Sequence, residues 1–397
     1  MVYVFYALAA LLILQGIGSL IEGFQFLAFV RRALRAPLDS FTPKLTIIAP
    51  CKGIDPELEE NLSALFNQDY PDYEIIFAIA SSDDAARPVI ERVISKHKNR
   101  IARLVIAEPS LVRSEKVNNL LCALDDVSDD SQALVFVDSD ARVRSGWLRS
   151  LVAPLRDARV GAATGYRWYL PARGGFFSAL LSAWNGSVAT TLGDHSRNFA
   201  WGGSTVILKE TFERIGVRES WQRAVSDDYA LTRAVQRAGL RIHFEPRCLN
   251  LSREDVELRA LLEFTTRQVI ITRAYRPRVW WIGLISQILY CAIFFGGAAF
   301  LVVNALRGGV AIAPLVMLSI IYLLGSIKGA LRIIAASEAL PQSRKDILSL
   351  WWMYVLLWPL VSLVFLYNFI KSATTRRIKW RGVVYEMCSP DDTRVLN

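Results

Sequence analysis

Residues 133–140 read Ala-Leu-Val-Phe-Val-Asp-Ser-Asp, five apolar residues followed by two carboxylates on either side of a serine. A short apolar run of this kind predicts a strand that is buried on both faces of a sheet. Ligands of such sheets bind beyond the carboxyl ends of the strands, where Asp138 and Asp140 would lie. Two carboxylates at that edge can hold a divalent cation, although the same residues could also simply form a turn.

The same pattern recurs on the N-terminal side of this strand. Further strands are expected at residues 44–50, 74–79 and 102–107, and helices at residues 85–98 and 116–124. Another helix should begin at Asp55, whose side chain can cap it, with Pro56 in its first turn. Strands that alternate with helices predict a Rossmann-like α/β domain with a mostly parallel, doubly wound sheet.

Two further acidic turns are expected at the same edge of the sheet. Asp83 and Asp84 follow the strand at residues 74–79 and could hydrogen-bond a nucleoside. The residues Ser226-Asp-Asp-Tyr229 precede a helix at residues 230–238, and one of these aspartates could take the proton from a hydroxyl group. Each turn could equally be a helix N-cap, because Ser and Asp side chains accept hydrogen bonds from the free N–H groups of a helix start.

The composition indicates a membrane protein, since 53% of the 397 residues are hydrophobic and only 21% are charged. A helix of about 20 apolar residues crosses a bilayer. Stretches of about that length or longer lie at residues 2–30, 280–304, 309–327 and 347–370. The expected organisation is an N-terminal anchor at 1–30, a soluble domain with interfacial helices at 31–279, transmembrane or re-entrant segments at 280–370 and a basic tail at 371–397.

Basic residues next to these stretches set the orientation. Much of the net charge of +9 flanks the apolar segments, which favours an anionic bilayer rather than nucleic acid as the partner. The soluble domain is therefore expected in the cytoplasm, at the inner membrane if the source is bacterial. Three C-terminal crossings would place the basic tail outside. One of them is thus expected to be re-entrant or interfacial, and the proline-containing stretch at 347–370 is a candidate.

The order of the motifs resembles the family 2 type of inverting glycosyltransferase with a GT-A fold, and more closely its ceramide glucosyltransferase-like branch. The motifs that carry the resemblance are Gln68-Asp-Tyr-Pro-Asp-Tyr-Glu74, Asp83-Asp84, Lys116-Val-Asn-Asn119, Asp138-Ser-Asp140, Trp201-Gly-Gly-Ser204, Ser226-Asp-Asp-Tyr229, and Trp380-Arg-Gly382 with Tyr385. The resemblance implies a membrane-bound enzyme that transfers a hexose, with glucose favoured, from a UDP-sugar to a lipid hydroxyl such as that of ceramide. It also implies Mg²⁺ or Mn²⁺ as a cofactor.

The resemblance assigns roles to single residues, with Asp228 as the catalytic base. The donor site would comprise Asp83, Asp84, Lys116, Asp138, Arg267, Gln268 and Arg273, with the metal on Asp138 and Asp140. The acceptor site would comprise Trp201, Gly202, Gly203 and Asp227. One departure concerns the family's diphosphate-binding segment, in which Gln or Arg is followed after two residues by Arg-Trp. Ile270 and Ile271 stand at those positions, so Arg267 or Arg273 would supply the cation.

Alternatives remain at this point. A processive polysaccharide synthase shares the catalytic layout but needs a transmembrane channel for its product, and a non-catalytic membrane scaffold could retain the fold. The apolar residues 176–192 are expected in the membrane interface near the acceptor path, with a buried core helix as the alternative. The enzymatic hypothesis requires Asp84, Asp140 and Asp228 to lie at one edge of a single sheet.

Overall fold

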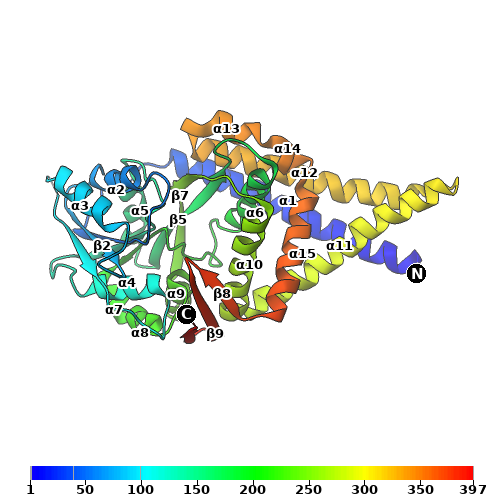
Figure 1. The fold of residues 1–397 in the computed structure, drawn as a ribbon. Helices are drawn as coiled ribbons and strands as arrows, with labels where there is room; N and C mark the ends of the chain where they lie inside the picture. The colour runs from blue at the N-terminus through cyan, green and yellow to red at the C-terminus, as the bar shows by residue number, and fades with distance from the viewer. Residues whose placement is uncertain (1, 39, 99, 397) are drawn as a thin grey trace. The chain divides into compact units, whose positions relative to one another are not determined.

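A computed structural model describes residues 2–38, 40–98 and 100–396 of the chain. The chain divides into two compact units, each of which combines segments that are far apart in the sequence (Figure 1). The helical unit comprises Met1–Arg31, Tyr169–Thr190 and Arg253–Thr375. The sheet unit comprises Arg32–Trp168, Thr191–Ser252 and Arg376–Asn397.

In the described part of the chain, the sheet unit is built on a seven-stranded sheet with the order β3-β2-β1-β4-β6-β5-β7. The strands are β1 (Leu45–Pro50), β2 (Tyr73–Ile79), β3 (Ala102–Ile106), β4 (Ala133–Val137), β5 (Val160–Leu170), β6 (Ser204–Leu208) and β7 (Arg241–Arg253). β1 pairs in parallel with β2 and β4, and β2 with β3, whereas β6 is antiparallel to both β4 and β5. The mostly parallel, doubly wound sheet is therefore confirmed, and its antiparallel part begins at β6.

Helices cover both faces of the parallel strands, which explains why most residues of those strands are apolar. The helices of this unit are α2 (Leu58–Phe66), α3 (Arg87–Lys96), α4 (Glu115–Leu124), α5 (Trp147–Val152), η1 (Ala153–Arg156), α7 (Lys209–Arg214), α8 (Val217–Trp221) and α9 (Asp227–Arg237). Figure 1 shows α2, α3 and α5 on one side of the sheet and α4, α7 and α8 on the other. Every residue of β1, β2 and β4 is buried. Ile47, Ile75 and Val135 of these strands pack in one core with Leu62 and Ile90 of α2 and α3.

The start of α2 differs from the prediction. The residue before the helix is Glu57, which has a left-handed backbone with φ of 56° and makes no capping hydrogen bond with its side chain. The Asp55 carboxylate instead accepts hydrogen bonds of 2.7 Å each from the Ser139 hydroxyl and the Arg381 guanidinium. The prediction that Asp55 caps this helix is therefore wrong, because both carboxylate oxygens of Asp55 accept hydrogen bonds from distant parts of the chain.

A small antiparallel sheet is formed by β8 (Arg377–Trp380), β9 (Val383–Ser389) and β10 (Asp392–Val395). The turn between β8 and β9 is Arg381-Gly382, with φ values of 46° and 87°. Two-residue hairpin turns need positive φ at both positions, which strains a side chain such as that of Arg381. The Tyr385 hydroxyl accepts a hydrogen bond of 3.2 Å from the backbone N–H of Glu115. This contact ties the small sheet to the start of α4.

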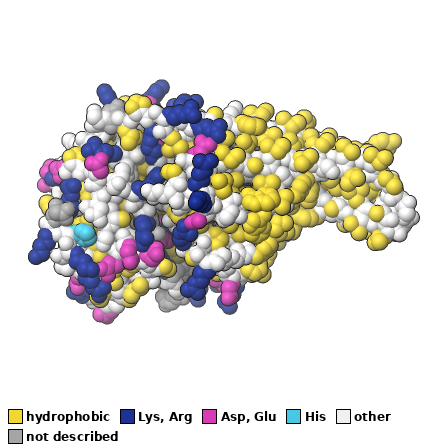
Figure 2. All heavy atoms as spheres, turned by 90° about the horizontal axis from the view of Figure 1, so that it is seen from above, with side chains coloured by type: hydrophobic (Ala, Val, Ile, Leu, Met, Phe, Trp, Pro, Cys, Tyr) yellow, Lys and Arg dark blue, Asp and Glu magenta, His cyan; other side chains and the backbone are white. Residues whose placement is uncertain are grey.

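The helical unit contains the membrane-spanning candidates. Among the described residues, three helices are long and apolar enough to cross a membrane: α1 (Val2–Arg35), α11 (Pro277–Leu306) and α12 (Ile312–Ala339). Figure 2 shows hydrophobic side chains over most of the visible surface of the long helices. Residues 347–370, which the structure describes throughout, are instead divided among α13 (Arg344–Ser349), α14 (Trp351–Val355) and α15 (Trp358–Thr374), with Pro359 in the first turn of α15.

Residues 347–370 thus form no single long helix, and the expectation that one C-terminal stretch does not cross the membrane stays a prediction. The sheet unit includes both residues 191–252, before α11, and residues 376–397, after α15. A single folded unit lies on one side of a membrane, so the chain between these segments must cross an even number of times. Crossings by α11 and α12 alone satisfy that condition.

Two further helices, α6 (Phe176–Ala189) and α10 (Leu258–Tyr275), belong to the helical unit. Ten of the 14 residues of α6 are buried, and the helix contacts α10, α14 and α15. The Trp184 ring stacks on that of Phe365 in α15, with ring centroids 5.0 Å apart. The apolar segment is therefore the buried core helix that the sequence left as the alternative to an interfacial one.

Candidate functional site

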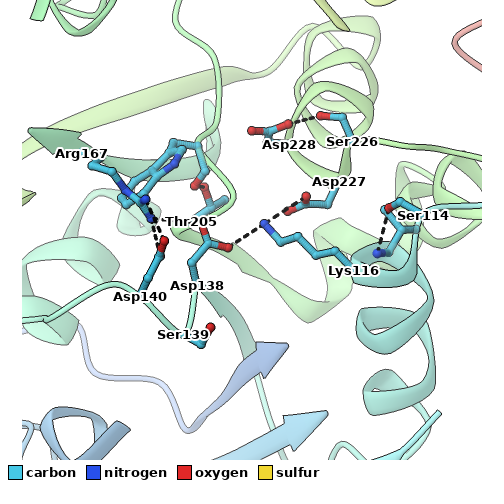
Figure 3. Close-up of polar contacts among 12 residues, drawn as sticks. Ser114, Lys116, Asp138, Ser139, Asp140, Arg167, Thr205, Ser226, Asp227 and Asp228 are labelled. Atoms are coloured by element: carbon cyan, nitrogen blue, oxygen red, sulfur yellow. Dashed lines mark hydrogen bonds and ion pairs between the residues drawn. The ribbon is translucent and has the colours of Figure 1, made fainter. Parts of the chain in front are cut away.

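One buried lysine connects three of the motifs (Figure 3). Lys116 lies in the first turn of α4, which Ser114 caps by accepting a hydrogen bond of 3.2 Å from the backbone N–H of Val117. The Lys116 Nζ atom is 2.7 Å from Oδ1 of Asp138, directly after β4, and 3.2 Å from Oδ1 of Asp227 in the first turn of α9. Only 15% of the Lys116 side chain and 5% of that of Asp227 are exposed. The ends of β4, α4 and α9 therefore meet at one buried ion cluster.

The charges of this cluster follow from burial and from the neighbouring ions. Burial acts to lower the pKa of Lys116, but Asp138, Asp227 and Asp228 outweigh it and raise that pKa above its usual value. Burial acts to raise the pKa of Asp138, yet Lys116 and Arg167 hold it below its usual value. For Asp227, burial dominates over Lys116 and raises the pKa to about 6. Lys116 and Asp138 are therefore ionised at neutral pH, and Asp227 is the weaker acid of the two carboxyl groups.

The raised pKa of Asp227 predicts a pH-dependent gain in stability for Asp227→Asn. Asp227 has a usual pKa of 3.8 and a folded pKa of about 6, so proton uptake stabilises the fold fully below pH 3.8 and this stabilisation is lost as the pH rises through 6. The asparagine variant carries no charge to bury. Its unfolding free energy relative to wild type should rise between pH 4 and pH 7 by up to about 3 kcal/mol, measured by chemical denaturation.

A matched control for this prediction is Asp157→Asn. Asp157 is a surface carboxylate whose pKa is lowered to about 2, first by hydrogen bonds from the Arg159 side chain and backbone. Between pH 4 and pH 7 the Asp157 carboxylate is ionised in the folded protein. It is also mostly ionised in the unfolded chain, where its titration ends just above pH 4. The difference in unfolding free energy between Asp157→Asn and wild type should therefore hardly change with pH. A flat profile for Asp227→Asn as well would contradict the raised pKa.

A second ion pair lies beside the first. Arg167, in β5, donates from Nη1 to Oδ2 of Asp140 at 2.9 Å and from Nη2 to Oδ1 of the same carboxylate, and its Nη2 is 3.5 Å from Oδ2 of Asp138 (Figure 3). The Trp201 ring centroid is 5.1 Å from the Arg167 Cζ atom. Arg167 was not among the residues predicted for the site. A signal was present, because this arginine is the single charged residue in the otherwise uncharged run from 160 to 170, and a buried charge needs a partner.

The two glycines after Trp201 pack directly on the ion cluster. A Cβ atom at Gly202 would lie 2.3 Å from Oδ2 of Asp227 and 2.7 Å from Nζ of Lys116. A Cβ atom at Gly203 would lie 2.7 Å from Oδ2 of Asp138 and 2.2 Å from the Trp201 ring. The glycines thus allow the loop to approach the carboxylates, and their expected contact with an acceptor stays a prediction.

Gly202→Ala should therefore disturb the site more than an alanine elsewhere in the unit. The added methyl must displace the Asp227 carboxylate or the Lys116 ammonium, so we expect a loss of about 1–3 kcal/mol in unfolding free energy and weaker donor binding. Gly146→Ala is the matched control, because a Cβ atom there meets nothing within 4 Å and the backbone has φ of −86°. Thermal unfolding of the two purified variants compares them, and equal losses would argue against tight packing at residue 202.

The start of α9 positions the aspartate expected to be the base. The Ser226 hydroxyl caps α9 by accepting a hydrogen bond of 3.3 Å from the backbone N–H of Tyr229, and it donates to Oδ1 of Asp228. The same Oδ1 accepts a hydrogen bond of 2.7 Å from the Tyr229 N–H. The cap interpretation of this turn is therefore confirmed for Ser226, whereas the role of Asp228 as a base stays a prediction for a partly exposed carboxylate whose Oδ1 is held by two hydrogen bonds.

Asp84 lies in the loop between β2 and α3. Its Oδ1 accepts hydrogen bonds from the backbone N–H groups of Gly53 at 2.8 Å and Ala86 at 2.9 Å, whereas Asp83 is exposed. Burial raises the pKa of the Cys51 thiol after β1, and the carboxylates of Asp55, Asp84 and Asp138 raise it further. The loop after β1 thus contacts Asp84 through Gly53 and the Asp138-Ser-Asp140 motif through the hydrogen bond from Ser139 to Asp55.

Asp84, Asp140 and Asp228, which the enzymatic hypothesis requires to lie close together, are therefore at one edge of the sheet. Asp84 shares the surroundings of Cys51 with Asp138. Arg167 joins Asp138 to Asp140, and the charge of Asp228 acts on Lys116, which pairs with Asp138.

The C-terminal hairpin adds a further cation that the sequence analysis left without a role. The Arg381 guanidinium donates to Oδ1 of Asp55 at 2.7 Å and to the backbone carbonyl of Lys52. Burial acts to lower the Arg381 pKa, but Asp55, Asp140 and Asp138 raise it above its usual value. The turn of the small sheet thus reaches the loop after β1 and keeps a positive charge near the Asp138-Ser-Asp140 motif.

The remaining expected donor residues lie on α10 in the helical unit. Arg273 donates from Nη1 to the backbone carbonyls of Ser372 at 2.6 Å and Ala373 at 3.0 Å, at the C-terminal end of α15, where a cation complements the helix dipole. The Arg267 Cζ atom is 5.3 Å from the Phe264 ring centroid. The expected contact of Arg267, Gln268 and Arg273 with a donor stays a prediction.

The residues at the end of β4 fit a divalent cation that arrives with phosphate ligands. Within residues 2–38, 40–98 and 100–396, no group of three or more His, Cys, Asp or Glu side chains could hold a metal by itself. Asp138 and Asp140 nevertheless converge on one guanidinium, which shows that one positive group can reach both. Mg²⁺ is commonly held by one or two carboxylates together with substrate phosphates, so two aspartates are a sufficient protein contribution.

Comparisons with known proteins identify the family of the chain. The family model described as Glycosyl transferase family 21 matches residues 10–391. Ceramide glucosyltransferase 3 of Caenorhabditis elegans is 24% identical over 356 residues, which are 88% of this chain and 74% of that protein. The ceramide glucosyltransferase of Gibberella zeae is 31% identical over 140 residues, which are 33% of this chain and 26% of that protein.

A solved structure has the same fold. The mannosyltransferase from Pyrobaculum calidifontis, solved in complex with GDP-Man and Mn²⁺, superimposes with a TM-score of 0.50 and 18% sequence identity. The superposition covers 93% of this chain and 98% of that chain. The expected GT-A fold is thereby confirmed.

Proposed function

Because the chain belongs to glycosyl transferase family 21, we propose that it transfers a hexose, with glucose favoured by family likeness, from a UDP-sugar to the hydroxyl of a membrane lipid, with inversion at the anomeric carbon. Ceramide or a lipid with a similar hydroxyl is the proposed acceptor, since ceramide glucosyltransferases are among the relatives. The observation that carries the proposal is the Lys116-centred cluster, which joins Asp138 at the end of β4 to Asp227 beside Asp228.

The donor would bind at the carboxyl ends of β1, β2 and β4. Asp84 would orient the nucleoside, and Lys116 would approach the diphosphate, because a buried and permanently charged ammonium is a strong partner for phosphate oxygens. Asp138 and Asp140 would hold a Mg²⁺ or Mn²⁺ ion. That ion would neutralise charge on the departing diphosphate.

Asp228 would act as the base. Its Oδ1 is fixed by Ser226 and Tyr229, which would leave Oδ2 for the acceptor. In the proposed step the lipid hydroxyl gives its proton to Asp228 while its oxygen attacks the anomeric carbon, and UDP leaves from the opposite face of the sugar. One displacement inverts the anomeric centre, so an α-linked donor gives a β-linked product.

The membrane supplies the acceptor in this proposal. The three candidate spans would anchor the chain, and the basic residues that flank them would place the sheet unit in the cytoplasm, where UDP-sugars are made available. Arg31, Arg32 and Arg35 at the end of α1 would contact anionic head groups.

The experiment is a transfer assay with the purified full-length protein in lipid vesicles. UDP-glucose or UDP-galactose is supplied with ceramide or diacylglycerol, and the lipids are analysed by mass spectrometry and by NMR of the anomeric proton. We expect one β-linked hexose per lipid. A chain of several sugars would favour a polysaccharide synthase, and the absence of both transfer and UDP-sugar hydrolysis across all acceptors would favour a non-catalytic scaffold.

A further inference from the structure

Arg167 occupies both carboxylates of the Asp138-Ser-Asp140 motif. Its guanidinium forms two parallel hydrogen bonds with Asp140 and approaches Asp138 to 3.5 Å. The Arg167 side chain is 10% exposed, compared with 25% for each aspartate. The forked geometry of an arginine–carboxylate pair makes it stronger than an ordinary hydrogen bond, and burial reduces screening by solvent.

The position of Arg167 is set by rigid parts of the site. The residue belongs to β5, whose eleven residues are all buried, and its guanidinium faces the Trp201 ring at 5.1 Å. Displacing an arginine held in this way costs more free energy than displacing a flexible cation on the surface. Any second cation at Asp140 must therefore compete with it, because two positive groups on one carboxylate repel each other at short range.

We propose that Arg167 competes with the divalent cation for Asp138 and Asp140, and that it moves to the diphosphate of the donor when the cation binds. This inference rests on the proposed function, since it needs a nucleoside diphosphate and a metal at the same site. A diphosphate offers the guanidinium the same forked pairing that a carboxylate offers. Arg167 would then exchange one anionic partner for another rather than lose its partner.

The exchange makes metal binding and nucleotide binding interdependent. A metal ion alone must displace Arg167 without compensation, so its affinity is low. When UDP is present, the displaced guanidinium has a new partner, so UDP raises the affinity for the metal, and the metal raises the affinity for UDP by the same factor. The site therefore loads metal and donor together, and the carboxylates are kept neutralised until the donor arrives.

The test is Mn²⁺ binding to the full-length protein in detergent, followed by electron paramagnetic resonance of the free ion, with and without UDP. For wild type we expect weak Mn²⁺ binding that UDP strengthens by about tenfold or more, within the usual range of such couplings. Arg167→Gln should bind Mn²⁺ alone more tightly than wild type. UDP should then strengthen its Mn²⁺ binding by a smaller factor than in wild type, because only the direct phosphate ligands of the ion remain as a source of coupling. Arg167→Lys keeps the charge but lacks the fork, so its coupling should lie between the two.

Arg159→Gln is the matched control, because Arg159 also pairs through a fork, with Asp157, but on the surface. Arg159→Gln should bind Mn²⁺ as wild type does, both with and without UDP. If Arg167→Gln fails to fold, Arg167→Lys decides the question through its reduced coupling. Unchanged Mn²⁺ affinity and unchanged coupling in the folded Arg167 variants would overturn the exchange and leave the proposed function standing. Wild type that binds neither Mn²⁺ nor UDP would contradict the proposed function itself.

Discussion

Asp228→Asn should lower the rate of lipid glycosylation by about 10²–10⁴-fold, the usual contribution of a general base, while UDP affinity stays close to that of wild type. The amide has the same shape, and its oxygen can still accept the hydrogen bonds that Asp228 receives from Ser226 and Tyr229. It cannot take a proton from the acceptor hydroxyl. The measurements are initial rates with a UDP-sugar and a lipid acceptor, and UDP binding by titration calorimetry.

The matched control is Asp391→Asn. Asp391 pairs with Arg233 of α9, yet its side chain is 61% exposed and its contacts lie within a surface ion pair. Turnover of this variant should be nearly normal, since exposed pairs contribute little. Near-normal turnover by Asp228→Asn would refute its role as the base. A parallel loss of UDP affinity and turnover would assign Asp228 to donor binding instead.

The parallel part of the sheet and its carboxylates could be predicted from the sequence for one physical reason. Strands covered by helices on both faces are mostly apolar, so each appears as a short apolar run. This holds for β4 throughout, for β1 apart from Thr46 and for β2 apart from Glu74. The carboxyl ends of parallel strands also lie at the same edge of the sheet. A carboxylate directly after such a run, as at Asp138, is therefore placed at the ligand edge without any knowledge of the rest of the fold.

The ion pairs of the site could not be predicted in the same way. Arg167 reaches Asp140 because β5 joins the sheet through the antiparallel strand β6, and no local pattern sets that pairing. Arg381 reaches Asp55 across 326 residues of sequence. Because Asp55 makes this long-range contact, it does not cap α2 as the neighbouring sequence predicted. At Ser226-Asp-Asp, by contrast, local rules described the cap correctly, because that hydrogen bond is made within the turn itself.

Lys116→Met should destabilise the protein and abolish tight UDP binding. The variant leaves the Asp138 and Asp227 carboxylates buried without their shared cation, and breaking a buried ion pair from one side costs about 3–5 kcal/mol. Loss of a charge-assisted hydrogen bond to the diphosphate should weaken UDP binding by about 10–100-fold. Denaturant unfolding and titration calorimetry measure the two effects. Lys44→Met, which removes the partner of the exposed carboxylate of Asp130, should change neither measurably.

A double variant separates the two roles of Lys116. In Lys116→Met with Asp227→Asn, one of the two buried carboxylates is gone, so part of the lost stability should return, because Asp227 is the group whose charged form burial disfavours most clearly. UDP affinity should stay low, since the ammonium that would meet the diphosphate is still missing. If the double variant recovers stability and UDP affinity together, Lys116 acts only by holding the carboxylates, and the diphosphate must be neutralised by another cation of the site, such as Arg167 or Arg381.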